Sequence, residues 1–129
     1  MTAFRNFIGG VWQDAVGGGT FERRNPADGS DLVGLFPLSG PADAELALDG
    51  LDAGWRAWAA TNPEKRVEIL NKAADIILTR ADDLGRELTR EEGKTLSAGV
   101  MEWKRAAANL RLYSGEALRQ TGGFPAKNG

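Results

Sequence analysis

Residues 89–96 read Thr-Arg-Glu-Glu-Gly-Lys-Thr-Leu, and this stretch between two helical patterns decides how the chain is organised. A glycine after a run of helix-forming residues commonly ends a helix, because glycine adopts left-handed backbone angles without a steric penalty. Threonine is one of the residues that cap a helix N-terminus through the side-chain oxygen. We therefore predict that one helix stops at Gly93 and that Thr95 caps the next one.

The triplet from Gly93 to Thr95 also matches the end of the phosphate-binding loop G-x-x-x-x-G-K-[ST], in which backbone N–H groups surround the anion. The first glycine of that pattern would fall at position 88, which is Leu88. The preceding segment has a helical pattern and carries three glutamates that would repel phosphate. We therefore interpret the triplet as a helix boundary, and a phosphate-binding function fails at Leu88.

Three to four helices are predicted over about residues 41–120. The start of each helix is indicated by a first-turn proline, by a capping side chain or by a new start of the apolar periodicity. The expected first residues are Pro41, Pro63, Asp82 and Leu96. The last helix is expected to run to about Arg119.

Apolar residues recur at helical spacing along these helices. The main stripes are Ala44, Leu48, Leu51, Trp55 and Trp58; Val67, Leu70, Ala74, Ile77, Leu78 and Ala81; and Leu96, Val100, Trp103, Ala107 and Leu110. A second strip, on another side of the helices from Pro63 and Leu96, consists of Ile69 and Ile76, and of Met101, Ala108 and Leu112. A helix that is apolar on two sides needs neighbours on two sides. The chain is therefore expected to be part of a larger core.

Short strands and hairpins are predicted over about residues 4–37. Gly9 and Gly10 separate two apolar pairs, which is typical of a two-residue hairpin turn. A second turn is expected over residues 25–29, where Pro26 fixes φ and Asp28-Gly29 suits unusual backbone angles. The fold class is therefore α+β and mostly α-helical, and residues 1–129 are expected to form a single incomplete domain.

Composition excludes several partners. The net charge of −2 argues against nucleic acid and against an anionic membrane surface, since both require clustered positive charge. No apolar run approaches the roughly 20 residues of a membrane span, and Met1 to Gly10 lacks the basic start of a signal peptide. We therefore expect a cytoplasmic protein.

Catalytic side chains are scarce. The chain has no cysteine and no histidine, which excludes a thiolate nucleophile and the usual general base near neutral pH. Glu91 and Glu92 are adjacent on a helix, so they point about 100° apart and cannot act as a facing pair. Nothing in the sequence shows that Lys94 is desolvated, and three of the four tryptophans lie on apolar stripes, where core packing is expected. We assign no catalytic, cofactor-binding or metal-binding residue.

Six segments in order along the chain resemble the N-terminal part of the aldehyde dehydrogenase superfamily. They are Phe7–Trp12 (F-I-[NG]-G-x-W), Thr20-Phe21 with Asn25–Gly29 (T-F…N-P-A-T-G), Trp55–Trp58, Pro63–Arg66 with Ala73–Asp75 (P-x-x-R…A-A-D), Leu88–Leu96 (L-x-x-E-x-G-K-x-L) and Leu112–Ala117 (Y-[AS]-G-E-A). The segment from Glu91 to Leu96 is most similar to branches that oxidise semialdehydes such as α-ketoglutarate semialdehyde.

The resemblance implies the N-terminal part of the family's α/β cofactor-binding domain, with a small strand layer and helices that flank a Rossmann-like sheet. Family members use a cysteine, a glutamate and NAD or NADP to oxidise an aldehyde to an acid. Those residues come later in the family's sequence, and its sheet continues beyond the final segment Phe124–Gly129. Neither a catalytic residue nor cofactor binding by this chain alone is therefore implied. In some members an acid near Glu102 and a carbonyl near Arg23 hold a structural cation.

Two hypotheses follow. In the first, the chain is the N-terminal portion of an NAD(P)-dependent aldehyde dehydrogenase, inactive alone, whose partner is the remainder of that polypeptide. In the second, it is a non-enzymatic helical module that binds a partner or itself through exposed apolar faces.

Overall fold

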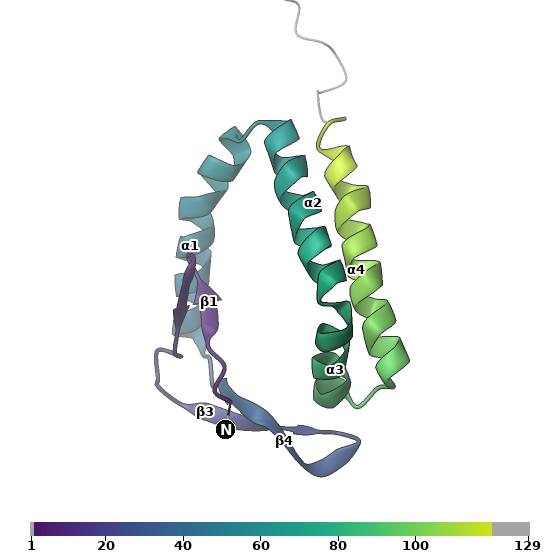
Figure 1. Ribbon diagram of the computed structural model, residues 1–129. Coiled ribbons are helices and arrows are strands. Elements are labelled where there is room, and N and C mark those ends of the chain that lie inside the picture. Colours follow the sequence, from purple (N-terminus) through teal and green to yellow (C-terminus); the bar gives the residue numbers. More distant parts are fainter. Residues whose placement is uncertain (1, 120–129) are drawn as a thin grey trace, which may run out of the picture. The chain divides into compact units, whose positions relative to one another are not determined.

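Short strands come first and four helices follow in the computed structural model, which describes residues 2–119 (Figure 1). The predicted fold class, α+β and mostly helical, is confirmed. The contacts divide the chain into two compact units, the first comprising Met1–Ala60 and Glu87–Lys94 and the second Thr61–Arg86 and Thr95–Gly129. Helix α3 (Ala81–Glu92) contributes to both units.

The first hairpin forms as predicted. Strands β1 (Asn6–Ile8) and β2 (Val11–Gln13) pair antiparallel around Gly9 and Gly10, whose φ angles are +59° and +84°. Two positive φ angles give the turn a twist that matches the twist of the flanking strands. Phe7 and Trp12 lie opposite each other, with ring centroids 4.8 Å apart.

The second hairpin forms, but its turn is shorter than predicted. Strand β3 (Thr20–Asn25) pairs antiparallel with β4 (Asp28–Pro37), so that only Pro26 and Ala27 are left in the turn. Asp28 and Gly29 belong to β4, and neither has a positive φ. Register shifts near the turn account for the difference, because the pairing skips Val33 and residues 29–31 of β4, and these extra residues bulge within the strand and do not lengthen the loop.

A third segment extends the second hairpin. The Phe4 N–H donates to the Leu35 carbonyl at 2.9 Å, and the Leu35 N–H donates to the Thr2 carbonyl at 3.0 Å. The Phe4 ring stacks on Phe36 with centroids 4.3 Å apart. A Cβ at Gly34 would lie 2.6 Å from the Phe4 ring, so glycine is required there for the segment to approach.

Helix α1 (Pro41–Ala60) is anchored by a buried acid. Asp43 is 6% exposed and accepts hydrogen bonds from the backbone N–H groups of Gly40 at 2.8 Å and Val16 at 2.9 Å. These two donors hold the pKa of the Asp43 carboxyl below its usual range. The carboxylate thus caps the first turn of α1 and fixes the loop after β2, a role that the apolar periodicity did not predict.

Two of the three stripe tryptophans do not pack as the sequence predicted. Trp55 and Trp58 on α1 are 59% and 41% exposed. In the first unit the β1–β2 hairpin lies against this helix near Gly50, where a Cβ would lie 3.3 Å from the Gly9 nitrogen. Within the first unit, the apolar stripe of α1 therefore stays largely uncovered.

The second unit is an antiparallel helix pair. Helix α2 (Pro63–Thr79) starts at Asn62, whose side chain accepts from the Glu64 N–H at 2.8 Å. Helix α4 (Leu96–Glu116) lies beside α2 and the first half of α3 (Figure 1). The facing pairs run in opposite directions along the chain: Gly85 with Val100, Asp75 with Arg111, and Asn71 with Ser114.

Small residues let these helices approach closely. The fully or nearly buried positions of α2, α4 and the first half of α3 are Ala74, Ala81, Gly85, Gly99, Ala107 and Ser114. Small side chains bury little apolar area each, so close backbone packing supplies much of the attraction. The predicted second strip stays exposed: Ile69 43%, Ile76 50%, Met101 60% and Leu112 64%.

Helix α4 ends three residues earlier than predicted. The N–H groups of Ala117, Leu118 and Arg119 bond to carbonyls three residues back, so the chain tightens into a turn after Glu116. Position 120 and the segment Phe124–Gly129 lie outside the described residues. No helix in the described range of the chain is long and apolar enough to cross a bilayer.

Two glycine-to-alanine substitutions are expected to have opposite effects on stability. A Cβ at Gly85 would lie 2.4 Å from Val100 Cγ2 and 2.8 Å from the Val100 nitrogen, so Gly85→Ala should destabilise by about 1–3 kcal/mol. A Cβ at Gly54 would meet nothing within 4 Å, so Gly54→Ala should stabilise by up to about 1 kcal/mol. Urea unfolding followed by far-UV circular dichroism measures both. Wild-type stability of Gly85→Ala would contradict the close packing of α3 on α4.

Candidate functional site

The stretch from Thr89 to Leu96 forms the predicted helix boundary. Gly93 has φ +76° and its N–H donates to the Thr89 carbonyl at 2.8 Å. The Thr95 hydroxyl accepts from the Ala98 N–H at 3.4 Å and caps α4. The Gly93 N–H is therefore bonded within the end of helix α3. In a phosphate-binding loop the corresponding N–H would point at the anion.

Gly93 also lies against the turn of the β3–β4 hairpin. A Cβ at this position would lie 3.1 Å from the Ala27 nitrogen and 3.3 Å from Pro26 Cβ. Backbone angle and available space therefore both favour glycine. The space that a bound anion would occupy on this side of Gly93 is filled by the hairpin turn.

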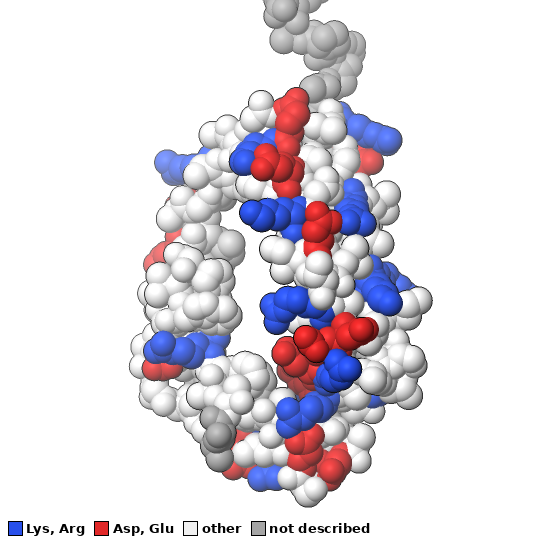
Figure 2. All heavy atoms as spheres, viewed as in Figure 1, with Lys and Arg blue, Asp and Glu red and all other residues white. Residues whose placement is uncertain are grey.

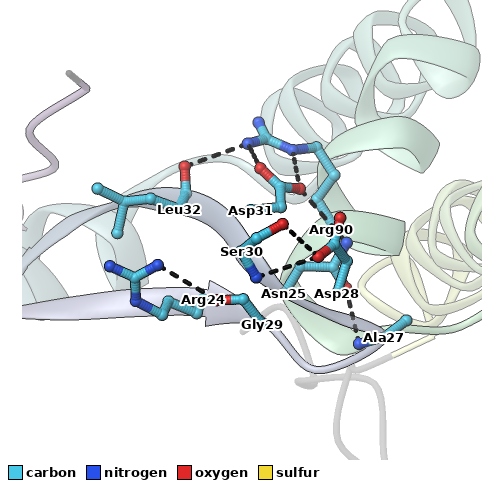
Figure 3. Close-up of polar contacts among 9 residues, drawn as sticks. All are labelled: Arg24, Asn25, Ala27, Asp28, Gly29, Ser30, Asp31, Leu32 and Arg90. Atoms are coloured by element: carbon cyan, nitrogen blue, oxygen red, sulfur yellow. Dashed lines mark hydrogen bonds and ion pairs between the residues drawn. The ribbon is translucent and has the colours of Figure 1, made fainter.

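An arginine–aspartate pair holds the end of α3 on β4 (Figure 3). Arg90 donates from Nε to Asp31 Oδ2 at 2.9 Å and from Nη2 to Asp31 Oδ1 at 2.5 Å. The same Nη2 donates to the Leu32 carbonyl at 3.2 Å, and Asn25 Nδ2 donates to Asp31 Oδ2 at 3.3 Å. We call this group of four residues the Asp31–Arg90 clamp.

The clamp is partly exposed to solvent. The exposed fractions are 47% for the Arg90 side chain and 28% for Asp31. The hydrogen bonds from Arg90 hold the pKa of the Asp31 carboxyl below its usual range, and they raise the pKa of the guanidinium. A bidentate pair of this kind fixes orientation as well as distance. Both carboxylate oxygens of Asp31 accept hydrogen bonds from protein donors. The clamp is therefore a structural contact between α3 and β4.

The neighbouring turn residues are also bonded internally (Figure 3). Asn25 Oδ1 accepts from the Ala27 N–H at 2.9 Å. Asp28 Oδ1 accepts from the Ser30 N–H at 3.0 Å and from its hydroxyl at 2.6 Å, which lowers the pKa of Asp28. These bonds are the local turn contacts that Asn and Asp side chains commonly make.

The charged residues next to Gly93 do not form an acid–base site. Lys94 Nζ forms an ion pair with Glu92 at 2.6 Å, and Glu91 is a separate half-buried residue. Within residues 2–119 no three Asp or Glu side chains gather as a metal site would require. Glu102 lies on α4 in the second unit and Arg23 on β3 in the first. The cation site implied by the resemblance stays a prediction.

Each unit has a shallow apolar groove that sequence reasoning did not predict. The one in the second unit has a volume of about 430 Å³ and is lined by Leu70, Ala106, Asn109, Leu110 and Tyr113. The one beside the hairpin in the first unit has about 320 Å³ and is lined in part by Phe7, Ile8, Ser39 and Ala47. Neither lining brings together an acid and a base, so the grooves carry no catalytic arrangement.

Comparison with known proteins gives one consistent family. The sequence profile of the aldehyde dehydrogenase family matches residues 12–128. The chain is 37% identical over 122 residues to the α-ketoglutaric semialdehyde dehydrogenase of Bacillus subtilis, covering 95% of this chain and 25% of that protein. It is 32% identical over 112 residues to the NADP(+) succinate-semialdehyde dehydrogenase of Escherichia coli, covering 87% of this chain and 23% of that protein.

A solved structure gives the same result for the fold. Succinate-semialdehyde dehydrogenase from Burkholderia pseudomallei superposes with a TM-score of 0.86 at 33% identity, covering 90% of this chain and 24% of that chain. The matched part is the N-terminal portion of such structures. The chain thus spans about a quarter of the length of the curated relatives that it matches.

Removing the arginine of the clamp should change the titration of its aspartate. We expect Arg90→Gln to raise the pKa of Asp31 back toward that of an unperturbed aspartate, because the hydrogen bonds from the guanidinium are lost. The stability that Asp31 contributes is present above its unfolded-state pKa and is lost as pH falls through the lower folded-state pKa. Arg90→Gln should therefore unfold less steeply in acid than the wild type. NMR titration of the side-chain carboxyl measures the first effect.

Arg56→Gln on α1 is the matched control, because Arg56 is exposed and has no ion-pair partner among residues 2–119. It should leave the Asp31 titration unchanged. If Arg90→Gln also leaves that titration unchanged, the clamp is not formed in solution.

Proposed function

Because this chain belongs to the aldehyde dehydrogenase family, we propose that it is the N-terminal portion of an NAD(P)-dependent enzyme that oxidises an aldehyde to a carboxylic acid. The observation that carries the proposal is the family match over residues 12–128. The structural likeness over 90% of the chain to a semialdehyde dehydrogenase supports it independently of single motifs.

We infer that the substrate of the whole enzyme is a semialdehyde. The relatives from Bacillus subtilis, Escherichia coli and Burkholderia pseudomallei are all named for semialdehydes. Their identities to this chain lie between 32% and 37%. A carboxylate on the substrate would require a basic side chain in the complete enzyme. Arg90 of the clamp does not provide it, because its guanidinium is bonded to Asp31.

Alone, this chain is expected to be inactive. Family chemistry requires a cysteine thiolate that adds to the carbonyl, and the chain has no cysteine. The described residues also do not fit a dinucleotide. The Gly93 amide donates to Thr89, the hairpin turn fills the adjacent space, and Lys94 is paired with Glu92. We therefore expect neither NAD nor NADP to bind the chain by itself.

We infer that the partner of this chain is the remainder of the dehydrogenase polypeptide. The second strip of α2 and α4 supports this, because Ile69, Ile76, Met101 and Leu112 are all at least 43% exposed. In a monomeric soluble protein such large apolar side chains, gathered on one helix pair, commonly mark a covered interface.

An activity assay tests the first proposal. We expect the purified 129-residue chain to give no NADH or NADPH formation with succinate, glutarate or α-ketoglutarate semialdehyde. Calorimetric titration with NAD and NADP should show no binding. A longer chain that continues through the cysteine and the glutamate should be active on at least one of these aldehydes. Turnover by the short chain would overturn the proposal.

The exposed apolar faces favour a second candidate function. The chain would be a non-enzymatic helical module that binds itself or another protein. This candidate needs no chemistry from the chain and rests on the same exposed residues of α2 and α4.

Dye binding and size measurements test the exposed strip. We expect the chain to bind ANS, and we expect the pair Met101→Gln and Leu112→Gln to reduce the fluorescence by about half, since two of the four exposed strip residues are removed. Helicity should stay unchanged, because both side chains are more than half exposed. A monomeric chain that does not bind ANS would count against an exposed strip in solution.

A further inference from the structure

The end of helix α3 belongs to a different compact unit from its start. The first half of α3 is part of the second unit, Glu87–Lys94 is part of the first, and the chain returns to the second unit at Thr95. The division falls inside one uninterrupted helix. We call Glu87–Lys94 the α3 strap, because it joins the end of this helix to the β3–β4 hairpin.

The two halves of α3 are held by different kinds of contact. In the first half Ala81 and Gly85 are buried, and Gly85 packs closely on Val100 of α4. No residue of the strap is fully buried. Helix α3 has 12 residues and is rich in charged side chains, and isolated helices of about that length are marginal in water. The strap therefore depends on its contacts with the hairpin.

Two exposed contacts hold the strap on the hairpin. Arg90 donates to both carboxylate oxygens of Asp31 and to the Leu32 carbonyl (Figure 3). An ion pair with an arginine that is 47% exposed contributes little stability, because water competes for both partners. The second contact is that of Gly93 with the turn at Pro26 and Ala27. Neither contact involves the buried residues that α3 and α4 share.

One polar group in the strap opposes its folded state. The side-chain oxygen of Thr89 is buried and has no hydrogen-bond partner among residues 2–119. A buried hydroxyl of this kind has lost its hydrogen bonds to water without a replacement. The stabilisation that Arg90 and Gly93 supply is thus partly offset at Thr89.

We propose that the α3 strap opens as a local unit. In the open state residues 87–94 leave the hairpin and lose their helical structure, while the first half of α3, helices α2 and α4 and the hairpin stay folded. Segments with little burial and exposed contacts open at a lower free energy than a packed core. The clamp controls the opening, since Arg90 is bonded outside the strap. The proposal goes beyond the proposed function, because it assigns a conformational change to the chain itself.

Amide hydrogen exchange measured by NMR tests the local opening. Three backbone N–H groups with defined acceptors report on the strap, on the first half of α3 and on the hairpin. They are Gly93, which donates to Thr89, Leu84, which donates to Arg80, and Leu38, which donates to Gly19. We expect the lowest protection at Gly93, because its hydrogen bond breaks in the open state.

Loss of the clamp should favour the open state. Arg90→Gln should speed exchange at Gly93 by about fivefold or more and leave Leu84 and Leu38 within about twofold of the wild type. The matched control is Arg86→Gln, which removes an exposed arginine of the same helix whose ion pair with Asp83 stays within the first half of α3. It should leave exchange at Gly93 within about twofold of the wild type.

Removal of the buried hydroxyl should favour the folded strap. Thr89→Val keeps the branched shape of the side chain and removes the unpaired oxygen, so it should slow exchange at Gly93 by about threefold or more. This variant tests the proposal in a chain that is expected to fold at least as well as the wild type. Circular dichroism confirms that every variant is folded.

Three outcomes would overturn the proposal. Equal protection of Gly93, Leu84 and Leu38 in the wild type would show that the strap opens only with the rest of the chain. Equal acceleration of all three by Arg90→Gln would show the same. If Arg86→Gln speeds exchange at Gly93 as much as Arg90→Gln does, the clamp does not control the opening.

Discussion

The left-handed backbone of Gly93 is the constraint on which the rest of the structure depends. Its φ of +76° ends α3 and turns the chain so that Thr95 can cap α4. Without that reversal α4 could not run antiparallel to α2 and place Val100 on Gly85. The hairpin turn lies directly against Gly93, so a side chain there would disturb both the helix end and the β3–β4 hairpin.

Local rules predicted most of the elements. The Gly9-Gly10 hairpin, the helix start at Pro63 and the helix boundary at Gly93 depend on a few adjacent residues, and all three form as predicted. The turn predicted over residues 25–29 is shorter in the structure, because extra residues in β4 near the turn leave only Pro26 and Ala27 in the reversal. Bulges arise from pairing along the whole hairpin, which the turn residues by themselves do not encode.

Contacts between distant residues could not be predicted from the sequence. Arg90 and Asp31 are 59 positions apart, so no local pattern links them. Asp43 drew no prediction from the sequence, yet it is buried and accepts hydrogen bonds from the backbone N–H groups of Val16 and Gly40. Periodicity likewise predicted the apolar stripe of α1 without showing what covers it. Trp55 is 59% exposed, and the contact that the first unit makes with α1 at the β1–β2 hairpin lies near Gly50.

The two proposed occupants of the apolar faces compete for the same residues. A dehydrogenase remainder that covers α2 and α4 would bury Met101 and Leu112, and a second copy bound to the same strip would bury the same side chains. Binding of one therefore opposes binding of the other by mass action. When the remainder is joined covalently, its effective concentration is high and its contact dominates. Self-association through these faces is thus a property expected of the short chain, and it should weaken as the chain is extended toward the complete enzyme.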